Sequence, residues 1–162
     1  MSLLDNNFIN KISLEYDYSF YYLFNDGINL NPIFCDIVNA NNLILPAITL
    51  SKNCYEGMFR ECSSLVTAPV LPATVLADDC YSSMFYNCES LTIAPELPAI
   101  TLVNSCYRHM FYNCKSLETA PELPATTLAS SCYNMMFYGC SFTTAPELPA
   151  TTLASGCYNS MF

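Results

Sequence analysis

Cysteine is the most reactive type of side chain in this protein, which has 10 cysteines and one histidine among its 162 residues. Cys54 and Cys62 would lie about 12 Å apart on a helix, too far for a disulfide within one unit. Cysteines of neighbouring units could form bridges, but a column of five always leaves one thiol over. We favour buried, reduced thiols that act as small hydrophobic residues, and inter-unit disulfides remain the open alternative.

Other residues that could support catalysis or metal binding do not form a recognisable pattern. The sequence has no Cys-x-x-Cys, and His109 has no counterpart in the other repeats. A zinc site or a Cys-His nucleophile is therefore poorly supported. Paired carboxylates, a Gly-rich phosphate loop and a Ser-His-Asp arrangement are also missing from the pattern. We predict a protein that is not an enzyme, with no catalytic residue, metal or cofactor.

Three glutamates are the first candidates for a binding surface. Glu96, Glu122 and Glu147 occupy the same slot of the phrase Ala-Pro-Glu-Leu-Pro, and Val70 occupies it in an earlier unit. If they stack, like charges face one another, which costs stability unless the carboxylates are solvated or neutralised. A solvated face is one interpretation, and a site for a cation or a basic partner is the other.

A tyrosine column is the second candidate surface. Tyr86, Tyr112 and Tyr138 each stand between a phenylalanine and a cysteine, at positions expected on an outer face. Exposed aromatic side chains suit contacts with protein or carbohydrate, whereas packing on the neighbouring unit is the alternative. Arg108 and His109, which lie at variable positions, complete the candidate surface.

These residues recur because the chain is an internal repeat. Cys-Tyr pairs, each followed by Met-Phe, return every 26 residues and finally after 25. Cys80, Met84, Phe85 and Cys88 fit one face of a short helix, and the following Pro-rich stretch must be extended. A period of this size indicates stacked coils that share one core. We predict a right-handed solenoid of the leucine-rich-repeat kind, with a short helix and short parallel strands in each coil.

The phrase "MFYNCESLTIAPELPAITL" and its copies resemble the BspA-like leucine-rich repeats of bacterial surface proteins. The resemblance covers roughly residues 43–162. It implies a surface-displayed, non-catalytic protein that binds protein or glycan, as in adhesion to host cells, located at a bacterial cell surface or outside the cell. Family analogy of this kind supports a fold better than a function.

Residues 1–42 do not fit the repeat and form the first predicted region, before the solenoid of residues 43–162. Alternation of apolar and polar residues up to Phe20, followed by Asn25-Asp26-Gly27, predicts a β-hairpin with a degenerate first coil. The hairpin would cap the solenoid, serve in docking, or do both. The candidate docking residues are Tyr16, Tyr18, Phe20 and Tyr22.

The amino-acid composition argues against several classes of binding partner. The formal charge of −9 disfavours nucleic acid and anionic lipid, and no apolar run is long enough to span a membrane. The first residues do not read as a secretory signal. This favours the alternative function, a structural or attachment component of a larger particle such as a phage virion, docked through the N-terminal region.

The last repeat stops at Met161-Phe162, before its closing cysteine. We expect further repeats or another subunit to cover this end, because an uncapped coil exposes apolar residues. Formation of a homo-oligomer is one way to cover this end.

Overall fold

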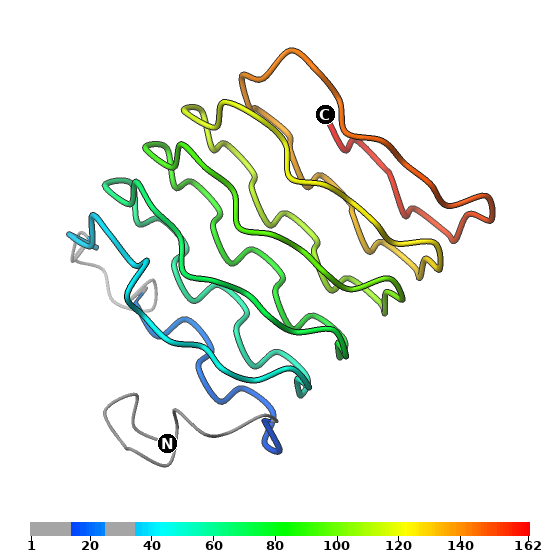
Figure 1. Ribbon diagram of the computed structural model, residues 1–162, viewed down its shortest axis with the longest axis horizontal. Coiled ribbons are helices and arrows are strands. Elements are labelled where there is room, and N and C mark those ends of the chain that lie inside the picture. The colour runs from blue at the N-terminus through cyan, green and yellow to red at the C-terminus, as the bar shows by residue number, and fades with distance from the viewer. Residues whose placement is uncertain (1–13, 25–34) are drawn as a thin grey trace.

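The computed structural model describes residues 14–24 and 35–162, which wind into a stack of flattened coils (Figure 1). Single parallel bridges join residues one repeat apart, such as Thr67 to Ile93 and Ile93 to Thr119. The coils therefore follow one another in register along the stack, and equivalent residues of successive repeats are neighbours.

The predicted leucine-rich-repeat class is wrong. The described residues contain no helix, and their only extended pairing consists of isolated one-residue bridges. The bridge residues are Asn39, Thr49, Thr67, Val75, Ile93, Thr101, Thr119 and Thr127. A coil of this protein is thus built from turns and irregular extended chain, not from a short helix and short strands.

Successive turns replace the predicted helix of each coil. We call these segments the turn arrays; they span residues 17–24, 52–61, 78–87, 104–113, 130–139 and 155–160. Every fourth residue has a positive φ, as at Asp79 (55°), Ser83 (56°) and Asn87 (58°). A residue with positive φ cannot continue a right-handed helix, so the chain turns back at each of them.

Backbone hydrogen bonds in the turn arrays alternate between two kinds. The N–H of Met84 donates within its own turn to the Tyr81 carbonyl at 3.2 Å. The N–H groups of Tyr81 and Phe85 donate to the next coil, to the carbonyls of Cys106 and Met110, each at 3.0 Å. Both kinds of bond are satisfied without a helix, and the second kind ties the coils together.

The helix prediction failed because the apolar spacing of a turn array is close to that of a helix. Buried side chains recur in pairs four residues apart, at Cys80 and Tyr81, then at Met84 and Phe85, and then at Cys88. Over nine residues a period of four is hardly distinguishable from the 3.6 of a helix.

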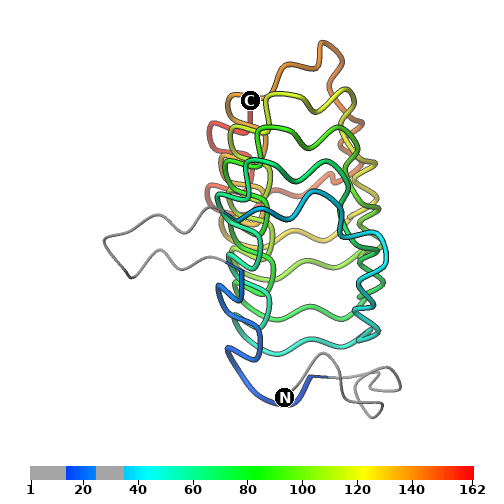
Figure 2. The ribbon, with the colours of Figure 1, turned by 90° about the vertical axis from the view of Figure 1, so that its left-hand side faces the viewer.

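The core lies between the turn arrays and the Pro-rich segments, which form opposite sides of the stack in Figure 2. The turn arrays contribute columns of Cys, Tyr, Met and Phe, and the Pro-rich segments contribute Leu and Ala. Tyr81 stacks on Tyr107 at 5.9 Å between ring centroids, and Phe85 stacks on Phe111 at 5.6 Å. Identical residues pack on one another in successive coils, which explains why the inward positions repeat.

Residues 17–24 of the N-terminal region form a turn array as well, so the hairpin strand predicted there is wrong. The N–H groups of Phe20 and Phe24 donate to the carbonyls of Cys54 and Met58, at 2.7 and 3.1 Å. Tyr18 has a positive φ and is 56% exposed, whereas the alternation placed it on the same face as the buried Phe20. The predicted turn at Asn25-Asp26-Gly27 lies outside the described residues.

In residues 14–24 and 35–162 no helix is long and apolar enough to cross a membrane.

Candidate functional site

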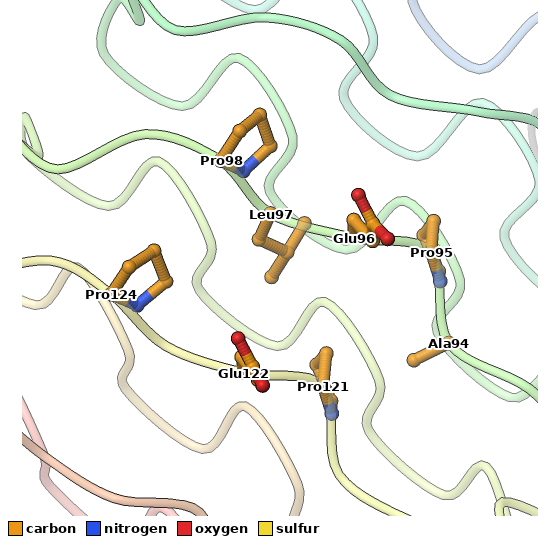
Figure 3. Close-up of a pocket in the computed structure, with 8 residues that line it drawn as sticks. All are labelled: Ala94, Pro95, Glu96, Leu97, Pro98, Pro121, Glu122 and Pro124. Carbon is orange, nitrogen blue, oxygen red and sulfur yellow. The ribbon is translucent and has the colours of Figure 1, made fainter.

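The Pro-rich segments line up on one side of the stack and form what we call the Pro-Glu face. It consists of residues 68–73, 94–99, 120–125 and 145–150, each with the pattern Ala-Pro-x-Leu-Pro-Ala. Figure 3 shows Glu96 and Glu122 at equivalent places in two successive coils. The leucines at positions 71, 97 and 123 are buried, while the three glutamates are exposed.

Successive coils make no backbone hydrogen bond to one another across this face. Prolines such as Pro95 and Pro98 have no N–H to donate. The remaining N–H groups of these segments, including those of Glu96 and Leu97, have no hydrogen-bond acceptor among the described residues. The Pro-Glu face therefore presents backbone groups that the stack itself does not use.

Hollows between the coils follow from this lack of pairing. One, of about 390 Å³, lies between the segments at 94–98 and 121–124, with Glu96 and Glu122 in its lining (Figure 3). The next, of about 320 Å³, lies one coil further and is lined by Glu122 and Glu147. A third, of about 400 Å³ and more apolar, holds Val70 and Ile93 on the other side of Glu96. The hollows thus form a series along the stack.

The charge of the Pro-Glu face is only negative. Among the described residues, every lysine and arginine lies in a turn array or within two residues of its end, outside the Pro-Glu face. Lys115 pairs there with Glu89 at 2.7 Å, and Arg60 with Glu61 at 3.3 Å. The structure thus places the three predicted glutamates on one face, and among the described residues no lysine or arginine lies there to neutralise them.

The tyrosine column is a tightly stacked row on the side of the turn arrays. Tyr86 lies 4.6 Å from Tyr112, and Tyr112 lies 5.1 Å from Tyr138, between ring centroids. The Arg60 guanidinium lies over Tyr86, 4.1 Å from the ring centroid. His109 contacts Tyr86 and Tyr112 edge-on. The faces of Tyr86 and Tyr112 are covered, so a sugar cannot stack on them.

Arg108 and His109, the other predicted residues on the side of the turn arrays, are less suited to binding a ligand jointly. Arg108 is exposed and lies next to His109. Burial, with the positive charges of Arg108 and Arg60, lowers the pKa of His109 below its usual value. Arg60, which the sequence analysis did not single out, is the residue that extends the tyrosine row. Its position two residues before Cys62 matches that of Tyr86 before Cys88, and this spacing could have revealed it.

The candidate docking residues do not form one surface. Tyr16 is 70% exposed, whereas Phe20 is buried and stacks on Tyr55 at 5.6 Å. Tyr22 is half-buried against Gly57, where an added Cβ would meet its ring at 2.7 Å. Phe20 and Tyr22 therefore hold the first turn array on the stack.

The thiols are poor candidates for chemistry. Eight cysteines are free, and all but the half-buried Cys140 are buried. Burial raises the pKa of Cys54 and of Cys106 from 9.0 to about 12, so neither forms a thiolate near neutral pH. Cys35 and Cys62 form a disulfide between neighbouring coils, the alternative that the sequence left open. No group of three potential metal ligands occurs among the residues described.

Comparisons with known proteins add no relative: no family model, no curated protein and no solved structure matches this chain. The resemblance to BspA-like repeats therefore stays a prediction from the phrases of the sequence.

Proposed function

We propose that this protein is a non-catalytic binding scaffold that holds a protein ligand on its Pro-Glu face. The observation that carries the proposal is the series of hollows between successive coils, which repeat one set of lining residues. Small-molecule sites are concave and combine apolar walls with a few placed polar groups, and grooves on protein surfaces also receive extended peptide segments. Here prolines form the walls, and glutamates with unpaired backbone groups supply the polarity.

Rigidity supports the same proposal. The two prolines of each segment fix φ, and the leucine between them is buried in the core of the stack in the coils at 94–99 and 120–125. A surface that is ordered before binding loses little conformational entropy when a ligand arrives. A protein ligand suits this face better than a glycan suits the tyrosine row, because the ring faces of Tyr86 and Tyr112 are already covered.

A matched pair of variants tests the location. Glu122 lines both the 390 Å³ and the 320 Å³ hollow, so Glu122→Trp fills them. Glu89→Trp makes the same change of size and charge on the side of the turn arrays. Peptides selected from a random display library on the wild-type protein, together with a glycan panel, serve as probes.

We expect the selected peptides to lose binding to Glu122→Trp and to keep binding to Glu89→Trp. Peptides that bind Glu122→Trp as well as wild type would contradict the proposal, as would a protein that binds glycans and no peptide. Display of the scaffold at a cell surface, or on a larger particle, stays a prediction.

A further inference from the structure

The ligand of the Pro-Glu face can be specified further, on the basis of the function proposed above. We propose that the face binds a basic polypeptide segment in an extended, polyproline-type conformation that runs along the stack, across the coils. Three features of the face carry this inference: the charge, the unpaired backbone groups and the distance between equivalent residues.

The charge of the face determines the sign of the charge that the partner must carry. Glu96, Glu122 and Glu147 line two adjoining hollows, and the described lysines and arginines all lie elsewhere. A cationic side chain beside two of these carboxylates relieves their mutual repulsion and gains charge-assisted hydrogen bonds. The partner is thus expected to carry lysine or arginine, not a negative or neutral side chain.

Unpaired backbone groups indicate a polypeptide instead of a small cation. The N–H groups of Glu96 and Glu122, which are both exposed residues, have no acceptor among the described residues. They can donate to carbonyls of a bound chain, which a free cation does not possess.

Spacing determines the conformation of the bound segment. Parallel bridges flank the face between the coils that carry Glu96 and Glu122, at Ile93 and Thr119 and at Thr101 and Thr127. At the usual spacing of about 4.8 Å per paired coil, two coils span roughly 9.6 Å along the stack. A polyproline II helix repeats every three residues and rises about 9.3 Å in that distance. Basic residues at positions i and i+3 of such a segment therefore meet alternate coils. Prolines between them pack on the proline walls of the hollows.

A synthetic peptide with four Lys-Pro-Pro repeats provides the probe, and a Glu-Pro-Pro peptide of the same length is its control. Binding is measured by fluorescence anisotropy with fluorescein-labelled peptides at low and at 0.5 M salt. The test variant is the triple change Glu96→Gln, Glu122→Gln and Glu147→Gln. The matched control is Asp17→Asn, Asp36→Asn and Asp78→Asn, which changes the net charge equally outside the Pro-Glu face and breaks neither of the ion pairs at Glu61 and Glu89. Circular dichroism confirms that both variants fold like the wild type.

We expect the wild type to bind the lysine peptide and not the glutamate peptide, and affinity to fall with salt. The triple variant on the face should lose at least ten-fold in affinity and the control variant less than two-fold. Equal losses in the two variants would overturn the inference, because attraction would then follow net charge alone. If an unstructured lysine-serine peptide binds as tightly as the Lys-Pro-Pro peptide, the proposed polyproline-type conformation of the bound segment is contradicted.

The outcomes also separate this inference from the proposed function. If display-selected peptides lose binding to Glu122→Trp but bind the triple glutamine variant normally, the proposed scaffold function holds. The proposal of a basic partner is then wrong. If Glu122→Trp leaves both selected and lysine peptides bound, both proposals fail.

Discussion

Gly57 lies against the ring of Tyr22: a Cβ at this glycine would stand 2.7 Å from Tyr22 Cε2 and Cζ. Gly57 also has a φ of +60°, one of the positive values that recur every fourth residue of a turn array. The equivalent positions hold Ser83, His109 and Met135, so glycine is not required by φ alone. It is required where the first turn array, residues 17–24, docks on the stack.

Gly57→Ala is therefore expected to destabilise the protein through both φ and contact. The positive φ costs a non-glycine residue about 1–2 kcal/mol, and displacement of the Tyr22 ring adds to it. Gly156→Ala is the control: its φ is +64°, but its Cβ would meet only Ser131 Oγ, at an ordinary 3.4 Å. Urea unfolding should show a larger loss for Gly57→Ala. In a Tyr22→Ala background the two losses should become equal; a persisting excess would contradict the role of the ring.

Tyr107→Phe is expected to leave stability unchanged or to raise it by about 1 kcal/mol. The hydroxyls of Tyr107 and Tyr55 are buried and have no hydrogen-bond partner among the described residues, so each loses its hydration on folding without compensation. The phenylalanine keeps the stacking on Tyr81 and Tyr133. Thermal unfolding of Tyr107→Phe and Tyr55→Phe measures this. A loss of more than 1 kcal/mol in both would mean that the hydroxyls have partners after all.

Stability is expected to fall at alkaline pH because of the buried thiols. The pKa of Cys54 and of Cys106 is about 12 in the folded protein against 9.0 ordinarily. Above pH 9 the unfolded chain loses these protons while the folded protein keeps them, so ionisation favours unfolding. Each such thiol removes up to about 1.4 kcal/mol per pH unit between 9 and 12. The free energy of urea unfolding at pH 7, 9 and 10 measures the slope. Cys106→Ala should reduce it, and a slope that the variant leaves unchanged would exclude this thiol as a source.

Glycine substitutions distinguish a turn array from a helix. Ser131 has a φ of 55°, and the next coil has Gly156 at the same place. Ser131→Gly should therefore be neutral or stabilising by up to about 1 kcal/mol. Asn134→Gly, at a position without positive φ, should destabilise by a few tenths to 1 kcal/mol. Equal destabilisation by both, as in a helix interior, would argue against the turn arrays.

How far the sequence predicts this structure depends on the segment. The repeat period matches the bridges between residues such as Thr67 and Ile93, because stacking forces like residues onto like. The same pattern could not distinguish a helix from turns, since both bury Cys80, Met84 and Cys88. The signal that was missed is the residue type at every fourth position. Asn53, Asp79, Asn87, Asn113, Gly57, Gly139 and Gly156 are of types that tolerate positive φ.

The N-terminal region carried a similar signal. "DYSFYYLF", residues 17–24, matches "KNCYEGMF", residues 52–59, with Phe20 for Tyr55 and Phe24 for Phe59. The rings of these pairs stack at 5.6 and 5.1 Å. Apolar and polar residues also alternate in this segment as far as Phe20, which is typical of a strand. A strand was therefore predicted where the match to residues 52–59 indicates a turn array. The glutamate slot was visible from the sequence, but the hollows between coils depend on backbone pairing that no residue pattern specifies.

The central claim is that neighbouring coils pair their backbones in the turn arrays and leave them unpaired on the Pro-Glu face. Site-resolved amide hydrogen exchange by NMR tests it most directly. The N–H groups of Tyr81 and Phe85, which donate to the next coil, should be strongly protected. Those of Glu96 and Glu122 should exchange at close to the rate of an unstructured chain without ligand, and slow when the Lys-Pro-Pro peptide is added. Strong protection of Glu96 and Glu122 in the free protein would show that the coils are paired there, and would contradict the account.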